Sequence, residues 1–195
     1  FDIATGRLNN SGQMVQTGLQ SLDIEAGKLN NSGLIGYAAG DRASGNGGNA
    51  SPATPAAPTT AAGAGSTQNQ SQTAAAPLSL AQGRLNVSDG LTNSGNLTAN
   101  DGIELSTHNS LANSGKLQLG NLNARGALLD NREGEIITRQ AEITAQTLDN
   151  RQGSLTATET LTIRNQTTDN RRGTLQSGGG LAAAVQTLDN RNGQL

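Results

Sequence analysis

Four aspartates recur at a near-constant spacing in the second half of the chain, and they are the residues most capable of acid–base chemistry. They are Asp130, Asp149, Asp169 and Asp189, and an arginine follows each of them by two positions. Hydrolysis of a glycosidic bond needs two carboxylates at a set separation, in a groove where aromatic side chains hold the sugar. The acids here form one regular column beside arginines, and aromatic residues make up 1% of the chain. We therefore predict that the chain is not an enzyme and has no catalytic residues.

No other group of residues has the composition of a metal or cofactor site. His108 is the only histidine, and a turn position beside Asn109 is sufficient to explain it. The chain has no cysteine, which excludes disulfides, thiolate catalysis and cysteine-ligated metals. Calcium-binding solenoids repeat the motif G-G-x-G-x-D-x-U-x, and the segment 178–186, GGGLAAAVQ, lacks its aspartate. We predict no metal and no cofactor.

Composition excludes several further classes of protein. The net charge is -2 and the pI is about 5.3, so no basic patch is available for nucleic acid. No apolar run is long enough to span a membrane. The chain begins in mid-pattern without a signal peptide, which favours an excised fragment. Hydrophobic residues are only 33% of the 195 residues, which is poor material for one thick core.

The same aspartates belong to a motif that is repeated throughout the chain, and its most constant member is an asparagine. The repeated asparagines are Asn10, Asn31, Asn93, Asn113, Asn131, Asn150, Asn170 and Asn190. Apart from one interval of 62 residues, successive copies lie 18 to 21 residues apart. A leucine lies two positions before seven of the eight: Leu8, Leu29, Leu91, Leu111, Leu129, Leu148 and Leu188. Glycine follows each asparagine by two or three positions, which completes an internal repeat of about 20 residues.

Apolar residues between the motifs alternate with a spacing of two, as in Leu161/Ile163, which indicates strands rather than helices. Three short strands per repeat, separated by Gly and Asn turns, predict an all-β fold, a parallel β-helix (β-solenoid) with about 20 residues per coil. The leucines then stack into a core column. The asparagines lie at a corner about 4.8 Å apart and form a structural hydrogen-bonded ladder. We expect the glycines at this corner to adopt a positive φ.

The residues on either side of the last four asparagines are outward-facing aspartate and arginine. Stacked aspartates repel each other by roughly 1 kcal/mol per pair in water, and an adjacent arginine column cancels this repulsion and can bridge coils. Exposed ion pairs are individually weak. We therefore expect these columns to fix the register and to discourage association between neighbouring shafts.

The 62-residue interval contains an insertion that interrupts the repeats. Residues 40–77 hold all four prolines and no Leu, Ile, Val, Phe or Tyr. Such a segment cannot bury enough apolar area to order itself. We predict β-helix coils over 1–39, a disordered Pro/Ala/Gly/Ser/Thr-rich loop over 40–77, and further coils over 78–195. A binding loop is the alternative interpretation of the insertion.

The motif L-D-N-R-x-G-x-L, with its variant L-x-N-S-G-x-L, resembles the filamentous haemagglutinin repeat of exoproteins from Gram-negative bacteria. The resemblance covers residues 3–36 and 78–195. It implies a right-handed β-helix that is exported through an outer-membrane transporter of the two-partner-secretion pathway and is then secreted or held at the bacterial cell surface. Family members include adhesins and contact-dependent growth inhibition proteins, and the absence of cysteine suits this export route.

Two functions remain open at this point. The chain is either a structural shaft segment that extends a distal adhesive or toxin-delivering region, or a module that binds a receptor or glycan on a host or neighbouring bacterium. Binding would use coil faces or the insertion. Triplets such as Asn96-Leu-Thr98 and Asn165-Gln-Thr167 leave glycosylation open. Uncapped terminal coils also predict end-to-end self-association of this chain.

Overall fold

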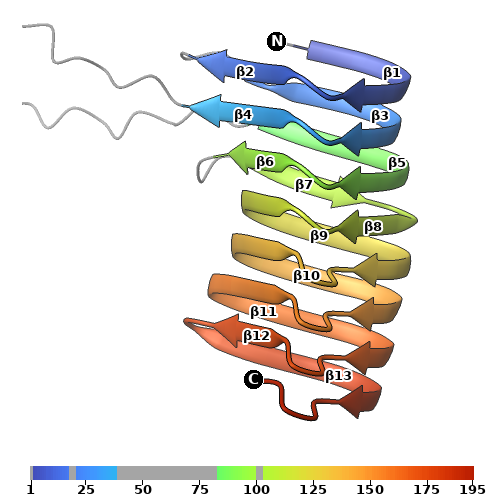
Figure 1. The fold of residues 1–195 in the computed structure, drawn as a ribbon, viewed down its shortest axis with the longest axis vertical. Coiled ribbons are helices and arrows are strands. Elements are labelled where there is room, and N and C mark those ends of the chain that lie inside the picture. The colour runs from blue at the N-terminus through green and yellow to red at the C-terminus, as the bar shows by residue number, and fades with distance from the viewer. Residues whose placement is uncertain (1, 18–20, 39–82, 100–102) are drawn as a thin grey trace, which may run out of the picture. The chain divides into compact units, whose positions relative to one another are not determined.

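The described residues form a stack of parallel β coils, which confirms the predicted fold class. The computed structural model of the chain describes residues 2–17, 21–38, 83–99 and 103–195. The predicted insertion 40–77 therefore lies outside the described residues. The strands are β1 (Asp2–Asn10), β2 (Gln13–Thr17), β3 (Asp23–Asn31), β4 (Leu34–Ala38), β5 (Gly83–Asn93), β6 (Asn96–Ala99), β7 (Ile103–Thr107), β8 (Ser110–Asn113), β9 (Lys116–Asp130), β10 (Glu135–Asp149), β11 (Ser154–Asp169), β12 (Thr174–Ser177) and β13 (Gly180–Asp189). All of their pairings are parallel, and consecutive coils lie side by side (Figure 1).

The coils repeat in register, so that each residue pairs with the equivalent residue of the next motif. Strand β10 pairs with β9 on one side and with β11 on the other. The 62-residue interval is also a single step of the stack, because β3 pairs directly with β5 and β4 with β6. The long interval therefore adds chain without adding a coil between the asparagines at its two ends.

Each coil contains three straight segments, as the alternating apolar pairs predict. Strands β6, β7 and β8 are separate, and all three pair with successive parts of the single long strand β9. In the later coils the three segments are continuous. The pairing of β10 with β9 skips Arg139 and Gln146, and these two positions divide the strand into its three segments.

The core is a narrow apolar column that runs through the stack. Side chains alternate in and out along each strand, so β7 buries Ile103, Leu105 and Thr107 and leaves the residues between them more exposed. Five of the predicted column leucines are fully buried: Leu29, Leu91, Leu111, Leu129 and Leu148. Leu, Ile, Val and Ala suffice for this core because each coil is covered on both sides by its neighbours.

Two column leucines differ from the prediction of a uniform core. Leu188, which was expected in the buried column, is 45% exposed, because no described coil follows the one that carries it. Leu8, in the first described coil, is only partly buried for the same reason. Burial of a motif leucine therefore depends on a coil at each side and not on the motif alone.

One position of the leucine column holds a buried threonine, and the structure explains it. Thr168 is 1% exposed, and its hydroxyl accepts a hydrogen bond from Nδ2 of the buried Asn165 at 3.5 Å. Asn165 Oδ1 accepts in turn from the backbone N–H of Ala145 at 3.1 Å. A threonine in place of leucine thus provides a polar partner for an inward asparagine that would otherwise lose one.

Candidate functional site

The eight repeated asparagines form one continuous hydrogen-bonded ladder along a corner of the stack. Each side chain from Asn10 to Asn170 donates from Nδ2 to Oδ1 of the asparagine in the next coil, and the seven N···O distances are 2.7–2.8 Å. The bonds therefore all point in the same direction. Seven of the eight asparagines are buried, and Asn190, in the last coil, is half-buried.

Each central rung of the ladder also provides a donor for backbone carbonyls at the corner. Asn150 Nδ2 lies 2.9 Å from the carbonyl O of Thr174 and 3.3 Å from that of Gly153. Its Oδ1 accepts from Asn131 at 2.7 Å. A buried carbonyl without a donor is unfavourable by the desolvation free energy of the group, so the asparagines satisfy backbone atoms that the strand pairing leaves over.

The motif glycines have a different role from the one that the sequence predicted. We expected them to adopt a positive φ, but the described motif glycines do not, and Gly126 is the described glycine that does, with φ of 130°. A Cβ on Gly153 would overlap the carbonyl oxygen of Asn131 in the preceding coil, and one on Gly173 would overlap that of Asn150. Glycine is required because the backbones of successive coils approach closely at this corner.

The positive φ occurs instead at the residue before each of the last four motif glycines. Glu133, Gln152, Arg172 and Asn192 have φ of 57–59°, in the left-handed region that non-glycine residues seldom occupy. The D-N-R-x-G form of the motif has one residue more than the N-S-G form, and this residue closes the wider turn. The difference in length between the two forms was a signal for this turn that our sequence analysis did not use.

The Asp–Arg face, formed by the aspartates and arginines on either side of the last four ladder asparagines, is a continuous chain of ion pairs. Each arginine binds the aspartate of its own motif, as in Arg151 Nη2–Asp149 Oδ2 at 2.7 Å. It also reaches the aspartate of the next coil, as in Arg151 Nε–Asp169 Oδ2 at 3.6 Å. The same alternation runs from Asp130 to Arg191. The predicted bridging between coils is therefore present.

These contacts lower the pKa of the carboxyl groups on the Asp–Arg face. The hydrogen bond from the Arg171 guanidinium is the main cause of the lowered pKa of Asp169, and that from Arg132 has the same effect on the pKa of Asp130. The Arg191 guanidinium lowers the pKa of Asp189 to about 2. The carboxylates are therefore charged at neutral pH, and none of these three is suited to act as a general acid there.

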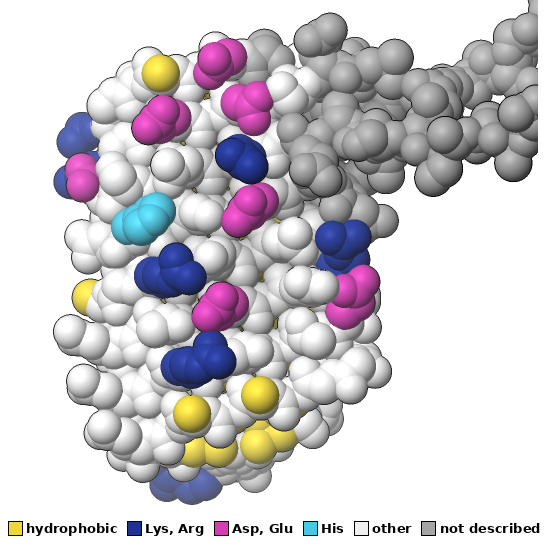
Figure 2. Space-filling view, turned by 180° about the vertical axis from the view of Figure 1, so that it is seen from behind, with side chains coloured by type: hydrophobic (Ala, Val, Ile, Leu, Met, Phe, Trp, Pro, Cys, Tyr) yellow, Lys and Arg dark blue, Asp and Glu magenta, His cyan; other side chains and the backbone are white. Residues whose placement is uncertain are grey.

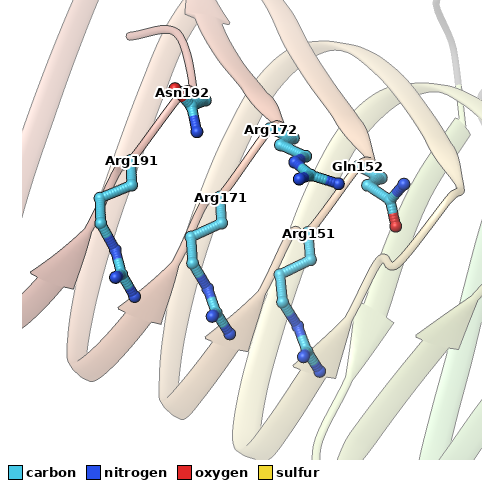
Figure 3. Close-up of a pocket in the computed structure, with 6 residues that line it drawn as sticks. All are labelled: Arg151, Gln152, Arg171, Arg172, Arg191 and Asn192. Carbon is cyan, nitrogen blue, oxygen red and sulfur yellow. The ribbon is translucent and has the colours of Figure 1, made fainter.

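An open groove of about 410 Å³ runs along the Asp–Arg face. Figure 3 shows Arg151, Arg171 and Arg191 in one row, one per coil, while Gln152, Arg172 and Asn192 lie along the other side. The row of three is ion-paired to aspartates. The groove is therefore a shallow surface with compensated charge, and it has no described acid positioned beside a second acid for hydrolysis.

The other candidate residues lie apart from this corner. His108 is at an exposed bend, as predicted, and among the described residues no group of acids and histidine could hold a metal ion. Asn96 is exposed, whereas Asn165 is 7% exposed and engaged in the core, so burial opposes modification of the second triplet only. The face opposite to Figure 1 has acidic and basic side chains scattered among uncharged ones (Figure 2).

The first coils carry a second, exposed asparagine contact that the sequence analysis missed. Asn30 Nδ2 donates to Asn9 Oδ1 at 2.7 Å. These residues precede the ladder asparagines by one position and take the place that aspartate has in later motifs. The doubled asparagine in L-N-N-S-G was the available signal.

The arrangement of the described residues supports cohesion between coils rather than bond making or breaking. Its polar side chains are used in ladders that connect one coil to the next. None of the described residues belongs to a helix that could cross a membrane. No protein-family model, no curated protein and no solved structure matches the chain.

Proposed function

We propose that this chain is a structural shaft segment, which holds a distal adhesive or toxin-delivering region away from the surface of the cell that makes it. The observation that carries the proposal is the unbroken asparagine ladder, in which the donor of every coil is used by the next coil. Seven steps of about 4.8 Å separate Asn10 from Asn190 by roughly 34 Å. A spacer needs such length and cohesion and needs no reactive group.

The export route and location form part of the same proposal. The repeated L-D-N-R-x-G-x-L motif resembles filamentous haemagglutinin repeats, which supports two-partner secretion through an outer-membrane transporter and a place at the bacterial cell surface. The chain would then be part of an adhesin or of a contact-dependent growth inhibition protein. Coils that fold by stacking on one another suit export of an unfolded chain, because each new coil can add to the one before it.

We also propose that the chain performs no catalysis and needs no cofactor. The aspartates that are most regular in the sequence are each bound by an arginine at 2.6–2.7 Å. A carboxylate held in this way has a lowered proton affinity and little freedom to approach a substrate.

The proposal is tested by measuring binding of the fluorescently labelled chain to host epithelial cells and to sibling bacteria. A variant that lacks residues 40–77 is measured beside it, because the insertion is the alternative binding element. A shaft segment gives no saturable binding to either cell type. Saturable binding of both proteins would assign a receptor site to the coils, and binding that is lost with residues 40–77 would assign it to the insertion. Either result would replace the shaft with the binding module.

A further inference from the structure

The last described coil presents an apolar end face that its equivalents in the stack keep buried. Leu181, Leu188 and Leu195 are 39%, 45% and 60% exposed. The residues that pair with the first two in the coil before, Leu161 and Thr168, are 0% and 1% exposed. Hydrophobic side chains accordingly gather at the C-terminal end of the stack in Figure 2. The strand β13 pairs with β11 alone and therefore also presents a free backbone edge.

The first described coil presents the complementary end face. Strand β1 pairs with β3 alone, and Ile3, Leu8 and Met14 are only partly buried although they pack against the core. The pairing registers align these residues, coil by coil, with the exposed residues of the last coil. The aligned pairs are Ile3 with Leu181, Leu8 with Leu188, Asn10 with Asn190, and Met14 with Leu195.

The two end faces differ in hydrogen-bonding polarity. At the last rung, Asn190 Nδ2 has one described acceptor, the carbonyl O of Gly193, at a long 3.4 Å. At the first rung, Asn10 Nδ2 is used, and none of the described residues donates to Oδ1 of this asparagine. The unused donor at one end thus matches the unused acceptor at the other. Two C-terminal faces together would place donor against donor.

The outward residues match in the same sense. Asn30 donates to Asn9 of the coil before it, so the free Nδ2 of Asn9 is directed to where a preceding coil would lie. In the last coil the residue aligned with Asn9 is Asp189, whose carboxylate accepts hydrogen bonds. The two forms of the turn are compatible neighbours, because the N-S-G turn of Asn113 already stacks on the N-R-E-G turn of Asn131 at 2.8 Å.

From these observations we infer that the C-terminal end face binds the N-terminal end face of a second copy of this chain. The contact is head-to-tail and continues the coil register, with Leu188 on Leu8 and the Asn190 amide donating to Asn10. Because each copy keeps one face of each kind, the contact does not close and gives open-ended assemblies. This inference concerns self-association and does not depend on the proposed shaft function.

The test is sedimentation equilibrium of the full chain and of two variants, each blocked at one end. Leu188→Lys places a charge on the C-terminal face, and Leu8→Lys places one on the N-terminal face. Both positions are incompletely buried, so each variant is expected to keep the wild-type circular dichroism spectrum. Leu195→Lys and Ile3→Lys provide a second pair on the same faces, which replaces the first if either variant unfolds.

Head-to-tail binding predicts a distinctive set of masses. The wild type grows beyond a dimer as concentration rises, each variant alone remains a monomer, and an equimolar mixture of the two forms a dimer and nothing larger. A wild type that remains monomeric at millimolar concentration would overturn the inference. So would dimers of the Leu8→Lys variant alone, which would show pairing of two C-terminal faces, and so would a mixture that stays monomeric.

Discussion

Replacement of a central ladder asparagine by leucine is the sharpest test of what holds the coils together. In Asn150→Leu the shape of the side chain is nearly kept, while two acceptors lose their donor. They are Oδ1 of Asn170 at 2.7 Å and the carbonyl O of Thr174 at 2.9 Å. A buried acceptor left unpaired costs about 1–3 kcal/mol. We therefore expect the free energy of unfolding to fall by about 2–6 kcal/mol.

The matched control is the same substitution at the last rung, Asn190→Leu. Asn190 gives only the long bond to Gly193, and its donor Asn170 keeps the carbonyl O of Gln194 at 2.9 Å. We expect this variant to lose less than about 1 kcal/mol. Urea unfolding followed by far-UV circular dichroism measures both variants. Midpoints that agree with each other would refute the claim that the ladder stabilises the stack.

An isosteric variant separates hydrogen bonding from packing at the same rung. Asn150→Asp retains the volume, but at neutral pH its carboxylate has no proton to donate and faces the Oδ1 of Asn170. Burial and this oxygen raise the pKa of the introduced carboxyl above its unfolded value of about 3.9. The variant is then most stable below that pH and loses stability as pH rises through the folded pKa. A pH-independent urea midpoint would contradict this account.

Three further predictions follow from the corner and from the Asp–Arg face. Gly153→Ala should lower the free energy of unfolding by about 3 kcal/mol, since its Cβ would overlap a backbone carbonyl, whereas Gly12→Ala, with no atom within 4 Å of the added Cβ, should change it by less than about 0.5 kcal/mol. Gln152→Val should cost about 1–2 kcal/mol in a thermal melt, because φ of 58° disfavours a β-branched residue. Because contacts with arginine lower the pKa of Asp169 and bring that of Asp189 to about 2, the thermal midpoint should be level above pH 4 and fall between about pH 4 and 2, where these carboxylates take up protons.

Each of these predictions has its own control. Equal melting temperatures for Gly153→Ala and Gly12→Ala would show that the corner can open to accept a methyl group. Gln152→Gly should be neutral or stabilising, since glycine adopts this φ freely, and a loss equal to that of the valine variant would argue against backbone strain. Asp189→Asn removes one of the titrating groups, so an acid transition as steep as that of the wild type would assign the effect to other carboxyl groups.

Much of the fold and of the candidate site could be predicted from the sequence, because in a solenoid the same local pattern meets itself in every coil. The recurrence of Leu148, Asn150 and Gly153 at 20-residue intervals predicts a column, a ladder and a close corner without knowledge of any distant contact. The aspartate and arginine on either side of Asn150 alternate outward by the two-residue period of a strand. These inferences require only periodicity.

The remaining features depend on what lies against a residue in the neighbouring coils, which no single motif contains. The role of Gly153 follows from the carbonyl of Asn131, which is 22 residues away in the chain and in contact only after stacking. The positive φ of Gln152 arises from closing the wider turn over that contact. Exposure of Leu188 arises because burial in a solenoid is a property of two coils and not of one. The sequence by itself therefore determined the columns and their period, whereas the contacts between coils determined which backbone angles, burials and hydrogen bonds those columns adopt.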